Sequence, residues 1–114
     1  MALDPDFAAE LARELQPADY IAVLKLFRED MLRLVGVIEK AAAANDTVGL
    51  RAAAHGLAGA AGSMGAARLE AACQIAMSRH EVIPDLGVAA AEIRKLATAV
   101  LADIEHAIAR AEAA

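Results

Sequence analysis

The sequence contains no tryptophan, and its 114 residues include only one tyrosine, two phenylalanines and three prolines. Residues with β-branched side chains are also few, whereas alanine, which has the highest helix propensity, dominates. This composition argues against a β-rich fold and predicts an all-α protein. The length corresponds to one domain, residues 1–114, which has room for a single core but not for a nucleotide-binding kinase domain as well.

Basic residues and cysteine are scarce too. Lysine and arginine number 11 against 16 acidic residues, so the net charge is −5 and the isoelectric point is near 5.1. No basic stripe of the kind that binds nucleic acid is visible. Cys73 is the single cysteine, which rules out an intramolecular disulfide. No signal peptide and no apolar run of ~20 residues is present. We therefore expect a cytoplasmic monomer that binds neither nucleic acid nor membrane.

Helix signals divide the chain into five segments, whose expected ranges are 4–16, 17–44, 47–63, 65–80 and 85–114. Asp4, Asp46 and Asp85 are suited to cap the first, third and last of them, and Pro84 interrupts the chain before the last. Apolar residues recur in steps of three and four, which is typical of bundle helices. Those expected in the core include Tyr20, Leu24, Phe27, Met31, Leu34, Ile38, Ala41, Leu69, Cys73, Ala76, Ile93, Leu96, Val100, Ile104 and Ile108. The pattern predicts an up-and-down antiparallel four-helix bundle with a short N-terminal helix.

The third segment, 47–63, carries an unusual histidine. At ~100° per residue its larger apolar residues gather on one side, whereas His55 lies roughly 200° from Leu57. The residues expected around His55 are small apart from one arginine: Arg51, Ala52, Ala58, Gly59 and Gly62. A glycine inside a helix costs roughly 1 kcal/mol relative to alanine, so several glycines here indicate that this face needs room. Close packing between two helices of the same protein would also explain them.

The spacing of residues around His55 resembles the signature of histidine-containing phosphotransfer (HPt) domains. The matching residues run Ala54-His55-x-Leu57-x-Gly59-Ala60-Ala61-Gly62-Ser63-Met64-Gly65-Ala66-x-x-Leu69-x-x-x-Cys73. Most family members carry a lysine three residues after the histidine, and this chain has Ala58 there. The resemblance implies a phosphorelay carrier that accepts a phosphoryl group on His55 from a histidine kinase or a receiver-domain aspartate and passes it to a response regulator.

Such a carrier is not an enzyme with its own turnover and has no ATP site or cofactor of its own. The resemblance implies that the partner receiver domain supplies the aspartate and a divalent metal. We expect no metal site in this chain, Arg51 as the nearest cation to support the phosphoryl oxygens, and Ala52, Ala58, Gly59 and Gly62 as the docking face. Two alternatives remain open: an adaptor that binds receiver domains with little or no transfer because of Ala58, and an unrelated helical interaction module.

Overall fold

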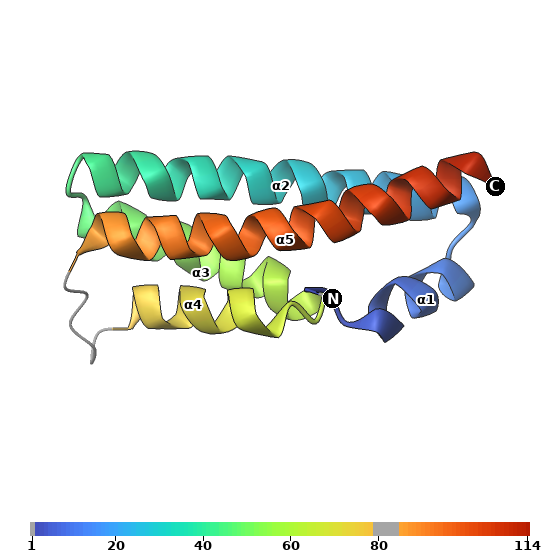
Figure 1. Ribbon diagram of the computed structural model, residues 1–114, viewed down its shortest axis with the longest axis horizontal. Helices are drawn as coiled ribbons and strands as arrows, with labels where there is room; N and C mark the ends of the chain where they lie inside the picture. Colours follow the sequence, from blue (N-terminus) through green and yellow to red (C-terminus); the bar gives the residue numbers. More distant parts are fainter. Residues whose placement is uncertain (1, 79–84) are drawn as a thin grey trace.

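The computed structural model describes residues 2–78 and 85–114, and within them the chain forms five α-helices and no strand (Figure 1). The helices are α1 (Pro5–Glu14), α2 (Pro17–Ala43), α3 (Thr47–Ser63), α4 (Ala67–Met77) and α5 (Leu86–Ala113). The all-α class predicted from composition is confirmed.

Aspartate side chains begin three of these helices, as the sequence predicted. The carboxylates of Asp4, Asp46 and Asp85 accept hydrogen bonds from backbone amides in the first turns of α1, α3 and α5. Proline occupies the first position of α1 and α2, where no amide hydrogen is needed. These caps mark where the three helices begin, and α3 begins at Thr47, directly after its Asp46 cap.

Helices α2 to α5 run alternately up and down, so that the bundle is antiparallel (Figure 1). Helix α2 packs against α3 and α5, and α4 packs against the same two helices from the other side. The bundle measures 46 × 22 × 18 Å. Among the described residues, no helix is long and apolar enough to cross a membrane.

The core contains most of the apolar residues that the periodicity selected. Those with at most 7% of their surface exposed include Leu24, Met31, Leu34, Ile38, Ala41, Leu69, Cys73, Ala76, Ile93, Val100, Ile104 and Ile108. Three expected core residues are only partly buried: Tyr20, Phe27 and Leu96. Two of these, Tyr20 and Phe27, lie on the half of α2 nearer its N-terminus. There the rings of Phe7 and Phe27 meet edge to face, with their centroids 5.9 Å apart.

Helix α4 is shorter than the expected range 65–80. Gly65 has a φ of 66°, a left-handed conformation that favours glycine, so the chain turns there and the helix begins two residues later. The helix ends at Met77. The expected end at His80 and the connection containing Pro84 lie outside the described residues.

The segment before α1 joins the core in a way that the sequence did not indicate. The backbone amides of Ala2 and Leu3 both donate to the Oδ2 atom of Asp103 on α5, at 2.8 and 3.1 Å. The Leu3 side chain is only 3% exposed. This segment therefore closes one end of the bundle.

Candidate functional site

His55 lies in the middle of α3 and is exposed. The opposite side of the helix carries Leu50, Ala53, Leu57, Ala61 and Met64, which are buried as the helical wheel predicts, whereas Ala60, expected on the same side, is only partly buried. Among the described residues, no side chain or backbone group forms a hydrogen bond or ion pair with the imidazole. The ring nitrogens are therefore available to an incoming group.

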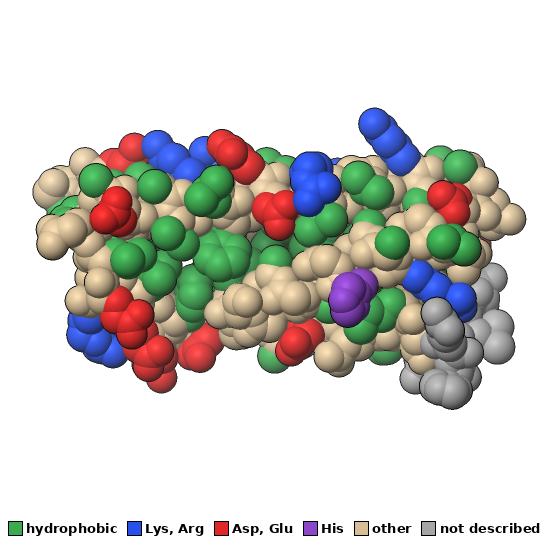
Figure 2. All heavy atoms as spheres, turned by 180° about the vertical axis from the view of Figure 1, so that it is seen from behind, with side chains coloured by type: hydrophobic (Ala, Val, Ile, Leu, Met, Phe, Trp, Pro, Cys, Tyr) green, Lys and Arg blue, Asp and Glu red, His purple; other side chains and the backbone are tan. Residues whose placement is uncertain are grey.

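The residues of α3 next to His55 on the exposed face are small, so no bulky side chain of theirs stands beside the imidazole. Ala52 and Gly59 are exposed, and a Cβ atom built on Gly59 would meet nothing within 4 Å. In Figure 2, a histidine side chain (purple) stands out from a surface made largely of tan atoms, which include the backbone, and of hydrophobic side chains (green). Gly59 therefore faces open space in the structure.

Helices α2 and α4 border this strip of α3. A Cβ on Gly56 would make ordinary contact with the Leu34 side chain of α2, at 3.5 Å from its Cδ2 atom. A Cβ on Gly62 would lie 2.5 Å from the Oε2 atom of Glu70 on α4. Gly62 is exposed, but the space that its side chain would fill is occupied by this carboxylate. Sequence reasoning missed Glu70 because its position depends on how α4 packs against α3.

Ala58 does not lie on the exposed face, and the expectation that it does is wrong. Its exposed fraction is 6%, and Ala54 is fully buried. The wheel treats α3 as having one buried stripe, but Ala58 lies about 40° from Gly62, on the flank where Glu70 of α4 lies, so the buried arc of α3 is wider than that stripe. Ala58 lies only ~60° from His55 on the wheel, but it falls inside that arc.

Arg51 lies one turn before His55 and is partly buried. Its Nε atom is buried and has no hydrogen-bond acceptor among the described residues. A buried donor without an acceptor raises the free energy of the conformation that holds it. This observation separates Arg51 from an ordinary solvated arginine.

The other chemistry-bearing side chains lie elsewhere. His106 is exposed on α5. Burial raises the pKa of the Cys73 thiol to about 12, and the nearby Glu70 carboxylate adds to the shift. In the part of the chain that the structure describes, no three His, Cys, Asp or Glu residues are grouped so as to hold a metal ion.

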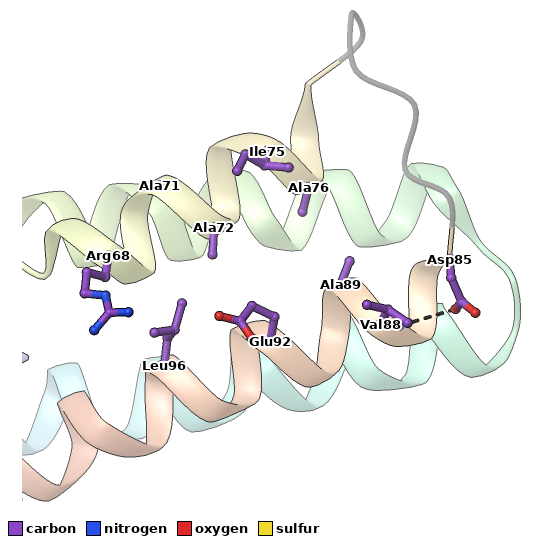
Figure 3. A pocket seen from close by; sticks show the side chains of 10 residues that line it. All are labelled: Arg68, Ala71, Ala72, Ile75, Ala76, Asp85, Val88, Ala89, Glu92 and Leu96. Carbon is purple, nitrogen blue, oxygen red and sulfur yellow. Dashed lines mark hydrogen bonds between the residues drawn. The ribbon is translucent and has the colours of Figure 1, made fainter.

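A groove between α4 and α5 is lined by no residue of α3 (Figure 3). Its wall is mainly apolar, with four alanines among the lining residues, Ile75 and Val88 exposed, and Arg68 and Glu92 as charged members. Because none of its residues belongs to α3, this groove is separate from the surface around His55.

The fold and the site define a class of protein. A helical bundle with an unpaired histidine on an open, small-residue helix face is suited to accept a group on the imidazole and present it to another protein. The family model of the Hpt domain matches residues 22–113, and the chain belongs to the Hpt family. Hpt domains are phosphocarrier modules of two-component phosphorelays, so a general role in phosphotransfer follows. No curated protein and no solved structure matches the chain.

Proposed function

We propose that His55 carries a phosphoryl group between a histidine kinase or receiver-domain aspartate and a response regulator. One observation carries this assignment: the His55 imidazole is exposed and unpaired among the described residues, in the middle of a helix strip without bulky side chains. His106 is exposed on α5, where it lines a concave region together with the charged residues Asp103 and Arg110, so its surroundings differ from the small-residue strip around His55.

The proposed chemistry is a displacement at phosphorus. A lone pair of a ring nitrogen of His55 forms the N–P bond as the P–O bond to the receiver aspartate breaks, and the aspartate leaves as a carboxylate. The reverse displacement passes the group to the next receiver. A divalent metal held by the receiver would neutralise charge on the phosphoryl oxygens. Helix α3 contributes direction, because the imidazole projects from a helix that is buried on its far side.

The docking face in this proposal consists of Ala52, Gly59 and Gly62, which lie along the exposed strip of α3. Their small size lets the partner's backbone approach the imidazole closely enough for in-line transfer. Ala58 is buried and is therefore not part of this face.

Arg51 is the cation that we propose supports the phosphoryl oxygens. The family lysine is absent at residue 58, and the Arg51 guanidinium holds a buried donor without an acceptor. If the guanidinium turned outward to a phosphoryl group on His55, one turn away, its Nε donor would gain a phosphoryl oxygen as hydrogen-bond acceptor.

The test is transfer from receiver domains that have been loaded with labelled phosphate by acetyl phosphate. We expect the label on His55, stable to alkali and lost in acid, and we expect His55→Gln to abolish labelling while His106→Gln retains it. Labelling of His55→Gln at the normal rate would overturn the assignment.

Alanine in place of the family lysine favours a second candidate, an adaptor that binds receiver domains but transfers slowly, since α3 has no cation at residue 58. The two candidates differ in one measurement. For an adaptor, receiver binding is detected by titration while transfer in the unaltered protein stays close to that of His55→Gln.

A further inference from the structure

The Glu70 side chain lies across the strip of α3 that bears His55. Its Oε2 atom is 2.5 Å from the position that a Cβ of Gly62 would take, and the residue is partly buried. Gly62 follows His55 by seven residues, or about two helical turns. It therefore points within about 20° of the same direction as His55 and lies about 10 Å further along the helix axis. The carboxylate is therefore part of the surface that would meet the receiver.

Among the described residues, no arginine, lysine or other donor forms an ion pair or hydrogen bond with the Glu70 side chain. Other acidic residues of the bundle do pair across helices: Glu105 accepts from Arg28 at 2.8 Å, and Glu39 accepts from Arg94. Glu70 thus contributes little to holding the helices together.

Covering an unpaired carboxylate with a protein partner removes its water. That loss is unfavourable unless the partner supplies a hydrogen-bond donor or a cation, and a desolvated carboxylate paired with a cation can contribute strongly to binding. A receiver that docks on this strip without such a group would leave the Glu70 charge uncompensated.

From these observations we infer that Glu70 is a specificity-determining contact, which pairs with a basic side chain of the receiver domain and fixes its orientation over His55. The inference rests on the proposed function. The Glu70 carboxylate makes the docking face electrically asymmetric, because the Arg51 cation lies one turn before His55 and the Glu70 anion lies two turns after it. A receiver rotated by 180° would meet the wrong charge at both ends.

The matched test compares Glu70→Gln with Glu92→Gln. Both changes remove one negative charge, and Glu92 is exposed on α5 in the groove away from α3. For transfer with a receiver domain, we expect Glu70→Gln to raise KM about tenfold, which corresponds to about 1.4 kcal/mol, with little change in kcat. Glu92→Gln is expected to leave both unchanged. High salt should reduce the difference in KM between Glu70→Gln and the unaltered protein, because salt screens the attraction between Glu70 and the basic side chain of the receiver.

A second variant checks that the position of the carboxylate matters, and not only its charge. Gly62→Ala would displace the flexible end of Glu70 at little cost, while a better helix former replaces glycine. We expect it to raise KM with no fall in the melting temperature, and to add little when combined with Glu70→Gln. Additive effects of the two changes would show that Gly62 does not act through Glu70.

The outcomes separate this inference from the proposed function. If the unaltered protein exchanges phosphoryl groups with receiver domains and Glu70→Gln has the same KM as Glu92→Gln, the contact is refuted and the carrier function stands. If phosphoramidate, a small donor that needs no docking, labels His55 but no receiver domain exchanges with it, both proposals fail. A KM raised only by Glu70→Gln supports the contact.

Discussion

Replacing Gly59 with leucine tests the docking face most directly. A Cβ at this position would meet no atom within 4 Å, so the folded bundle has room for the side chain. Leucine has a higher helix propensity than glycine by about 0.8 kcal/mol. For a domain of this size that gain corresponds to a rise in melting temperature of about 3 °C. We therefore expect Gly59→Leu to be at least as stable as the unaltered protein.

The same change should impair transfer. The leucine side chain would stand one turn from His55, in the space that the receiver must enter, and a misplacement of about 1 Å in a reacting complex can cost on the order of 100-fold in rate. We expect the rate of transfer from a phosphorylated receiver domain to fall between about tenfold and 100-fold. Gly59→Ala, which gains helix propensity but adds only a methyl group, is the matched control and should transfer at a rate much closer to normal.

Melting followed by circular dichroism and transfer followed by labelled phosphate together decide the matter. A transfer rate that is unchanged in Gly59→Leu would refute the docking face. A clear loss of thermal stability would instead mean that Gly59 packs against another part of the protein, and that the exposed strip is not where the structure has it.

Two further predictions concern the cation near His55 and the start of the chain. Arg51→Ala should slow transfer more in the natural protein than in an Ala58→Lys background, where a lysine whose apolar stem runs out from a buried position can replace the arginine. Equal effects in a double-mutant cycle of transfer rates would show that Arg51 does not stand in for the family lysine. Leu3→Ala should lower the free energy of unfolding by about 2–4 kcal/mol, measured by urea denaturation, because it leaves a cavity under a side chain that is 3% exposed. A loss below about 0.5 kcal/mol would mean that the segment before α1 does not belong to the core.

The helices were predictable because their signals are local. An aspartate that caps a helix acts on amides two or three residues away, as Asp46 does on Gly49, and its effect can be read without knowing the fold. The same holds for the spacing of buried residues in α2 and α5, each of which turns one stripe toward the core. His55 was found in this way too, since a single helical wheel separates it from Leu57.

The errors and omissions arise where two segments meet. A helical wheel with one buried stripe places Ala58 on the surface, but in the structure it lies in the wider buried arc of α3, on the flank next to α4. No local pattern indicates that Leu3 is buried, because the contact depends on hydrogen bonds from the Ala2 and Leu3 amides to Asp103, a hundred residues away.

The sequence by itself determined the helical class, the starts of three helices and the position of the candidate phosphoryl acceptor, because propensity, capping and helical period act over a few residues. Only the tertiary structure decided which flanks of α3 are covered and which side chain reaches across it. That Ala58 is hidden and that the Glu70 carboxylate lies over Gly62 depends on the packing of α4 against α3. Contacts of this kind form between residues on two different helices, so the spacing of residues along one helix does not predict them.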